Sequence, residues 1–125
     1  MMTFLRILAL GLLFFSPVAA QSNVETKVGD TVHLRALDII TGIVKDLEIK
    51  VGETLAYERL LIEIDECRFP VANATGDAFA YLVIHDVRED APRFEGWMIA
   101  SSPALSAMDH PRYDVWLLSC STSEG

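Results

Sequence analysis

Positive charge is scarce in this chain. Ten lysines and arginines stand against 18 aspartates and glutamates, which leaves a formal net charge of −8 at pH 7. An acidic protein of this size is repelled by nucleic acid and by anionic lipid surfaces, so we expect neither as a partner. Internal repeats, low-complexity segments and apolar runs of the about 20 residues that a membrane-spanning helix needs are also missing.

Cysteine is equally scarce, with Cys67 and Cys120 as the complete set. There is no C-x-x-C motif, and no histidine lies at ligand spacing from either cysteine, which argues against a redox-active or metal-binding pair. If the protein is exported to an oxidising compartment, the economical expectation is one structural disulfide. It would close a loop of about 50 residues, which the chain-entropy treatment values at roughly 4 kcal/mol.

The first 20 residues have the pattern of a secretory signal peptide. Arg6 precedes an apolar run from Ile7 to Phe15, and the small residues Val18-Ala19-Ala20 follow. This order predicts cleavage before Gln21, whereas an uncleaved membrane anchor is the less favoured alternative because the apolar run is short. We therefore predict an exported protein that keeps no direct membrane anchor after cleavage.

The remaining chain is expected to hold a flexible polar tail, 21–30, and a single mostly β domain, 31–121. Short apolar-polar alternation broken by turn residues indicates strands and not helices. The fold class that this spacing predicts is a small antiparallel sandwich or barrel. The predicted strands are Val32–Leu37, Ile43–Ile49, Thr54–Tyr57, Leu60–Cys67, Phe79–Asp86, Phe94–Ala100 and Tyr113–Cys120.

The side-chain pattern differs between these strands. Phe79–Asp86 and Tyr113–Cys120 are apolar on both faces, as expected of strands that are covered on both sides. Leu60–Cys67 instead has aliphatic residues on one face and acidic residues on the other, and strict alternation places Cys67 on the acidic face. Either the disulfide staples the sheet from outside or a bulge turns Cys67 inward. The pattern leaves both open.

Between the last two predicted strands we expect a short helical plug. Ser102 is placed to cap a helix, and Pro103 suits its first position. Ala104–Met108 would form one or two turns, and His110 ends them because it precedes a proline.

The sharpest catalytic candidate is Ser101 or Ser102 with His110, oriented by Asp109 or Asp114. No G-x-S-x-G elbow surrounds either serine, and Ser102 is better explained as a helix cap. We therefore assign no catalytic residue and lean towards a non-enzymatic protein. A small envelope hydrolase that uses these serines with His110 remains an alternative.

Other chemistry is more weakly indicated. The three histidines are scattered along the chain, whereas histidine ligands commonly come in short-spaced pairs, so we expect no metal and no cofactor. A carboxylate pair for glycoside chemistry, Glu63 with Glu66 or Asp86, is better explained as a solvated strand face.

Binding is the remaining possibility. The two tryptophans could form a platform for a glycan or a peptide, although their apolar neighbours favour a place in the core. A glycan- or peptide-binding module is thus a second alternative. The residues that we predict to line an interaction surface are Arg68, Asp77, Trp97, Ser101, Ser102, His110 and Tyr113.

Three segments together resemble a known family: LRALDIITG, CRFPVANATGDAFAYLVI and GWMIASSPALSAMDHPRYDVWLLSC. They are similar to the small secreted alphaproteobacterial family catalogued as domain of unknown function 2155, from about Leu34 to Cys120. The resemblance implies a Gram-negative periplasmic location and carries over no catalytic residue. Genes of that family often lie near the gene for a small accessory subunit of respiratory complex I, which implies a link to that complex. We therefore expect a periplasmic interaction or accessory protein whose partner is an envelope protein or complex.

Overall fold

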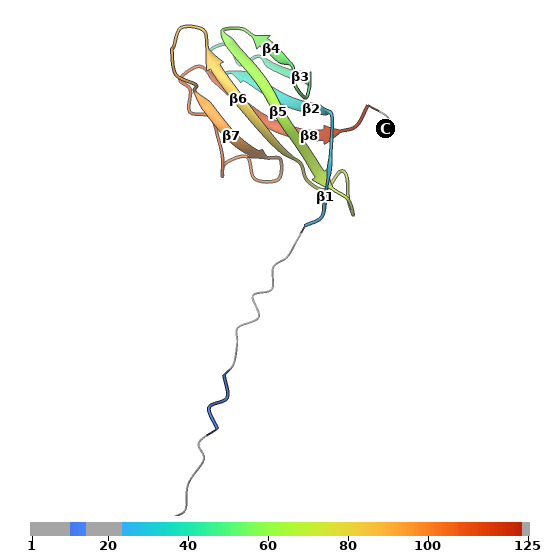
Figure 1. Cartoon of the computed structure of the whole chain (residues 1–125). Helices are drawn as coiled ribbons and strands as arrows, with labels where there is room; N and C mark the ends of the chain where they lie inside the picture. The colour runs from blue at the N-terminus through green and yellow to red at the C-terminus, as the bar shows by residue number, and fades with distance from the viewer. Residues whose placement is uncertain (1–10, 15–23, 124–125) are drawn as a thin grey trace, which may run out of the picture.

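The computed structural model describes residues 11–14 and 24–123, and the globular part is built from strands (Figure 1). Apart from residues 11–14, the predicted signal peptide lies outside the described residues. The strands are β1 (Thr26–Val28), β2 (Thr31–Asp38), β3 (Val44–Lys50), β4 (Thr54–Tyr57), β5 (Leu60–Pro70), β6 (Phe79–Asp86), β7 (Phe94–Ile99) and β8 (Tyr113–Ser121).

These strands form two antiparallel sheets that pack as a sandwich, which confirms the mostly β fold class. The five-stranded sheet has the order β1-β5-β6-β7, and β4 also pairs with β5. The three-stranded sheet has the order β3-β2-β8. Figure 1 shows the three-stranded sheet behind the five-stranded one, and the chain crosses between them after β7. The core lies between the sheets and includes Leu34, Ile62, Leu82 and Leu117.

All seven predicted strands are present, but β1 was not predicted. Thr26–Val28 lies in the segment that we expected to be a tail, and its polar sequence has no apolar alternation. The strand forms because β5 continues to Pro70, so that Thr26 pairs with Pro70 and Val28 with Arg68. This pairing joins distant parts of the chain, which local patterns do not report.

The outer faces of the two sheets are more open than the sequence predicted. In β6 only Ala80, Leu82 and Ile84 of the apolar residues are buried, whereas Phe79 and Tyr81 are half-buried. In β8, Trp116 is half-buried in the same way. The prediction that β6 and β8 are covered on both sides is wrong because, among the described residues, no third layer packs outside either sheet.

A bulge in β5 resolves the ambiguity over Cys67. The register between β5 and β6 shifts between Ile64 and Glu66, so Asp65 is the extra residue. An extra residue reverses the side-chain alternation beyond it. Cys67 is therefore fully buried and forms the disulfide with Cys120 from inside the sandwich.

The predicted helical plug is wrong. Residues 100–112 hold turns and no helix, with Ser102 N–H bonded to Ile99 C=O and Leu105 N–H to Ser102 C=O. One or two isolated helical turns are unstable because few hydrogen bonds repay the ordering of the chain. We call residues 100–112 the crossover loop, since they lead from the five-stranded sheet to the three-stranded one.

Gly29 is predicted to tolerate no side chain. A Cβ atom here would lie 2.9 Å from Ser121 O and 3.0 Å from Cys67 Sγ, with Cys120 Sγ closer still. We expect Gly29→Ala to lower the free energy of unfolding by about 2 kcal/mol, as overpacking of a tight core does. Urea unfolding would measure this, with Gly42→Ala at the open β2–β3 turn showing the separate effect of backbone conformation.

Candidate functional site

The structure divides the predicted interaction surface among different places. Arg68 and Trp97 lie on the outer face of the five-stranded sheet. Asp77 and Ser101 meet where β6 begins and β7 ends, and Ser102 follows in the crossover loop. His110 and Tyr113 are buried, with 6% and 2% of their surfaces exposed, so their assignment to a surface is wrong.

Asp77 and Ser101 form a clamp between β6 and the crossover loop. The Ser101 hydroxyl donates to Asp77 Oδ2 at 2.8 Å, and the Ser101 N–H donates to Oδ1 at 3.0 Å. Burial raises the pKa of Asp77, but the hydrogen bonds from Ser101 and Ala78 outweigh burial and hold this pKa below its ordinary value. The Ser101 hydroxyl is thus engaged with a carboxylate and not with a histidine.

His110 is held on both ring nitrogens. Its Nδ1 accepts the backbone N–H groups of Arg112 at 3.0 Å and of Tyr113 at 3.2 Å. An Nδ1 that accepts cannot carry the proton, so Nε2 carries it and donates to Asp86 Oδ2 at 2.8 Å. With its side chain fully buried, His110 has no nitrogen left to accept a proton from a serine. The structure therefore does not bring Ser101 or Ser102 and His110 together as a nucleophile and its base.

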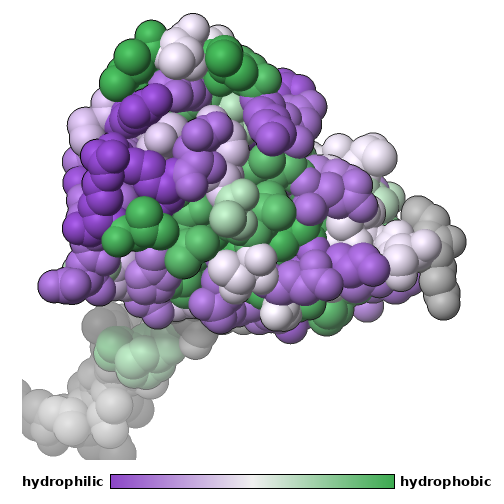
Figure 2. All heavy atoms as spheres, turned by 90° about the horizontal axis from the view of Figure 1, so that it is seen from above, coloured by the Kyte–Doolittle hydropathy of each residue, from purple (hydrophilic) through white to green (hydrophobic). Residues whose placement is uncertain are grey.

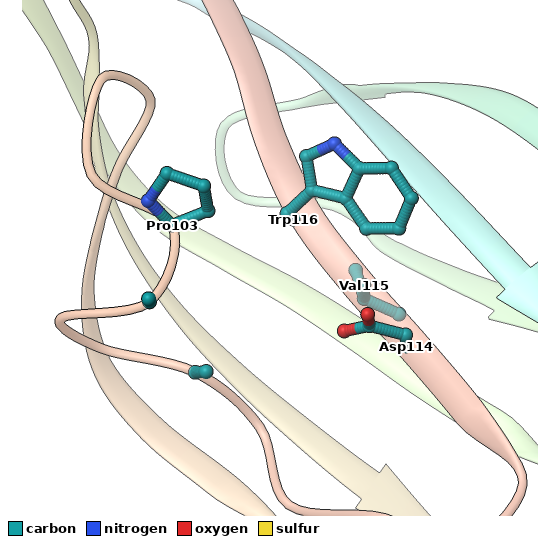
Figure 3. Close-up of a pocket in the computed structure, with 6 residues that line it drawn as sticks. Pro103, Asp114, Val115 and Trp116 are labelled. Atoms are coloured by element: carbon teal, nitrogen blue, oxygen red, sulfur yellow. The ribbon is translucent and has the colours of Figure 1, made fainter.

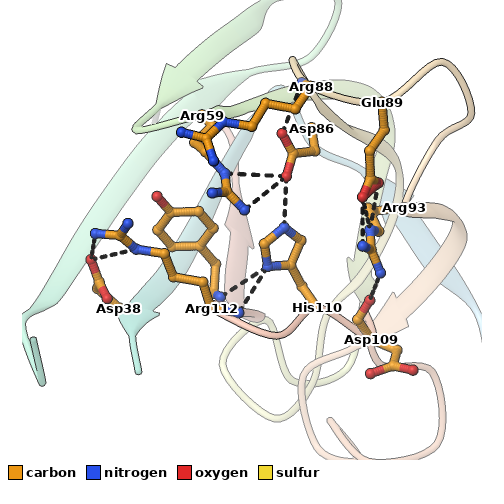
Figure 4. A network of polar contacts seen from close by, with 10 residues as sticks. Asp38, Arg59, Asp86, Arg88, Glu89, Arg93, Asp109, His110 and Arg112 are labelled. Carbon is orange, nitrogen blue, oxygen red and sulfur yellow. Dashed lines mark hydrogen bonds and ion pairs between the residues drawn. The ribbon is translucent and has the colours of Figure 1, made fainter. Parts of the chain in front are cut away.

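Asp86 is the centre of a buried polar network at the end of β6 (Figure 4). Besides His110, it accepts the Arg88 N–H at 3.0 Å and forms an ion pair with Arg59 at 3.2 Å. The hydrogen bond from His110 is the largest cause that lowers the pKa of Asp86 to about 2, followed by that from Arg88. The carboxylate thus stays charged although only 2% of the residue is exposed.

This network predicts acid sensitivity. The pKa of Asp86 is about 2 in the folded state and near its ordinary 3.8 in the unfolded state, so the unfolded state binds more protons between these values. The stability that Asp86 contributes is fully present above about pH 4 and is lost as the pH falls through about 2. Urea midpoints measured from pH 6 to pH 2 should therefore fall less steeply in Asp86→Asn than in the parent protein.

Tyr113 packs inside a cage of cations and aromatic rings. The Arg59 and Arg112 guanidinium carbons lie 5.6 and 5.4 Å from its ring centroid, and Tyr57 meets it edge-on at 5.6 Å. Arg112 also pairs with Asp38 at 3.1 Å, which fixes it over the ring. His110 and Tyr113 are therefore interior scaffold residues that join both sheets.

The sequence carried one signal of this network that was not used. Asp86 has the same strand parity as Leu82 and Ile84, both of which point into the core. A carboxylate at a core position requires donors, and the alternation of β6 alone therefore predicts buried partners for Asp86. Only the tertiary structure shows that His110 is the partner of Asp86.

An open apolar hollow lies on the outer face of the five-stranded sheet. Its volume is about 460 Å³, and we call it the Trp97 hollow. Trp97 is 40% exposed, so its predicted place in the core is wrong, and it meets the Tyr81 ring edge-on at 5.6 Å. Arg68 also lines the hollow and is paired with Glu66 at 2.6 Å. The lining residues are Val24, Thr26, Arg68, Phe79, Trp97 and Ile99.

A second exposed apolar group caps the β2–β3 hairpin. Ile39, Ile40, Ile43 and Val44 are between 53% and 71% exposed around the Thr41-Gly42 turn. Sequence reasoning missed this group, although the run IITGIV was the available signal. Seen from above, the surface carries hydrophobic patches set among hydrophilic side chains (Figure 2).

Residues 24–123 contain neither a cluster that could bind a metal ion nor the predicted pair of carboxylates for glycoside hydrolysis. No three histidine, cysteine or acidic residues there come close enough to hold a metal ion. Glu66 is paired with Arg68 on the surface, whereas Asp86 is committed to His110 in the interior. The described residues also contain no helix long and apolar enough to span a membrane.

Comparison with known proteins identifies a family for this chain but assigns it no activity. A family model described as "Uncharacterized protein conserved in bacteria (DUF2155)" matches residues 32–120. Uncharacterized protein RP359 of Rickettsia prowazekii (strain Madrid E) is 27% identical over 88 residues, which are 68% of this chain and 57% of that protein. The chain thus covers less than two thirds of the length of this relative. No solved structure matches.

Proposed function

The chain belongs to the bacterial family DUF2155, and we propose that it is an exported, non-enzymatic interaction protein of the cell envelope. The observation that carries this proposal is the Trp97 hollow, an exposed aromatic and aliphatic surface on the outer face of the five-stranded sheet. Exposed tryptophan beside arginine is the composition in which binding energy concentrates at protein interfaces. Large exposed apolar patches on soluble proteins commonly mark such interfaces.

The location is proposed to be the Gram-negative periplasm. The pattern of the first 20 residues supports it, and the inward-facing disulfide fits an oxidising compartment. Fractionation of native cells, with mass determination of the mature protein, tests both the compartment and cleavage before Gln21. A full-length protein in the cytoplasmic fraction would overturn this part of the proposal.

The partner is proposed to be an envelope protein or complex, with respiratory complex I as the first to test. A tagged protein would be crosslinked mildly in native envelopes, captured and analysed by mass spectrometry. We expect one recurrent partner in stoichiometric amount.

The matched variant pair is Trp97→Ser and Leu61→Ser, because both side chains are exposed on the outer face of the five-stranded sheet but only Trp97 lines the hollow. Capture should fall by roughly tenfold or more in Trp97→Ser and persist in Leu61→Ser. Background proteins alone, or equal capture by both variants, would contradict the proposal.

A further inference from the structure

β8 has one edge without a strand partner, and a pocket lies along it. β8 pairs with β2 on one side and with no strand on the other among the described residues. A pocket of about 390 Å³ separates it from the crossover loop, as Figure 3 shows. Asp114, Val115 and Trp116 line the β8 side, and Pro103, Ala104 and Ala107 line the loop side.

The lining shows that the pocket touches the strand at its edge and not on a face. Side chains of consecutive strand residues point to opposite faces, and Val115 is buried towards the core while Asp114 and Trp116 are half-buried outside. A pocket that contacts all three in a row must therefore run beside the backbone. Such an edge is a template for another extended chain.

The register identifies the backbone groups that face this pocket. Ile39 N–H donates to Arg112 C=O at 2.8 Å, so these opposed residues form a hydrogen-bonded pair. Because such pairs alternate along antiparallel strands, Asp114 and Trp116 direct their backbone groups towards β2. Val115 directs its N–H and C=O towards the pocket, and no hydrogen bond joins it to the crossover loop within residues 24–123.

Asp114 gives this edge a charge preference. Its carboxylate lies on the side of β8 that faces the loop in Figure 3, and no ion pair or hydrogen bond among the described side chains neutralises it. The whole chain is acidic as well, with a net charge of −8. A bound segment that places a lysine or arginine against Asp114 would therefore be favoured.

The free edge of β3 differs from that of β8. β3 has the sequence VKDLEIK, and its exposed side chains include both lysines and acidic residues. Charged side chains on an edge strand are one way in which natural sheets discourage strand addition. The pocket-lining part of β8 has one charged side chain, Asp114, and faces small residues across the pocket. The two edges of the same sheet are thus unequal templates.

We propose that the open edge of β8 binds an extended basic segment of a partner protein by strand addition, with hydrogen bonds to Val115 and a cationic side chain against Asp114. This inference rests on the proposed function, since it names a partner class for an interaction protein. It assigns a second contact, separate from the Trp97 hollow. Main-chain bonds would supply affinity, and Asp114 and the loop side of the pocket would supply selectivity.

The probe is a library of nine-residue peptides with β-branched or aromatic residues at alternate positions and a central Lys, Arg, Gln or Glu. Binding to the purified exported protein should favour Lys and Arg over Glu by about tenfold or more, equivalent to about 1.4 kcal/mol. Asp114→Asn should remove that preference, whereas Asp65→Asn, an exposed acid on the other sheet, should leave it intact.

Two variants of the crossover loop test the pocket itself. Ala107→Trp fills it from the loop side and should abolish peptide binding, while Leu105→Trp adds the same side chain at an exposed position that does not line it. Amide exchange supplies a direct readout. The Val115 N–H should exchange faster than those of Asp114 and Trp116 in the free protein and become protected when peptide binds.

The outcomes separate this inference from the proposed function. If Val115 is already as protected as its neighbours, or if Ala107→Trp leaves binding unchanged, strand addition at β8 is overturned. Self-association that Ala107→Trp abolishes would also overturn it, because the occupant would be a second copy. If envelope capture depends on Trp97 but not on Ala107, the proposed function stands and this inference fails.

Discussion

Replacement of both Cys67 and Cys120 by alanine should lower the free energy of unfolding by about 4 kcal/mol and the melting temperature by on the order of 20 °C. The disulfide spans 53 residues and joins β5 of one sheet to β8 of the other. Removing it restores the freedom of a long loop in the unfolded chain. It also removes buried sulfur, since Cys67 is fully buried and Cys120 is 4% exposed.

Thermal and urea unfolding of the oxidised parent, the reduced parent and the double variant would measure this effect. Thiol titration of the denatured, unreduced parent should find no free thiol. The matched control is Ser119→Ala, which lies beside Cys120 in β8 but carries no crosslink. Equal stability of the oxidised and reduced parent proteins would contradict the prediction.

His110→Ala should lower the free energy of unfolding by roughly 3 kcal/mol. The change removes the acceptor for two backbone N–H groups, those of Arg112 and Tyr113, and the donor to Asp86. Because His110 is buried, these groups lie away from bulk water and lose their partners when the ring is removed. The end of β6 would lose its connection to the start of β8.

Comparing two replacements of His110 separates the contribution of Nδ1 to stability from that of Nε2. His110→Asn places an amide oxygen near the position of Nδ1 and can still accept from the backbone, whereas His110→Ala cannot. We expect Asn to recover part of the lost stability, and urea unfolding would show it. Equal stability of His110→Ala and the parent would refute the scaffold role.

The same variants bear on the hydrolase alternative. A histidine that serves as a catalytic base should be dispensable for folding and essential for activity. The structure predicts the opposite order for His110, because both nitrogens already have structural partners. Loss of function in His110→Ala should therefore follow the fraction of unfolded protein.

The sequence by itself determined seven of the eight strands and the inward-facing residues of β5. Alternation in β5 placed Leu60, Ile62 and Ile64 inside and the acids outside, and the structure confirms it. Turn residues marked most strand ends, although β5 continues to Pro70 beyond its predicted end at Cys67. The three sequence segments that resemble the family pointed to it correctly. These features are local, because the period of two and the turn preferences depend on residues close together in the chain.

Tertiary structure decided what local patterns left open. A one-residue bulge at Asp65 turned Cys67 inward, and β1 formed only because distant β5 offered an edge. The crossover loop stayed non-helical, and the apolar outer faces of β6 and β8 stayed partly open because no layer among the described residues covers them.

The candidate sites show the same division. The sequence suggested Trp97 and Arg68 as interaction residues because of their residue types. Their exposure depends on which face of the sheet lacks a covering layer. His110 and Asp86 lie 24 residues apart and meet at 2.8 Å in the interior. The open edge of β8 exists because β8 ends the strand order β3-β2-β8. Strand order and edge exposure follow from long-range pairing, and alternation along one strand carries no information about its neighbours.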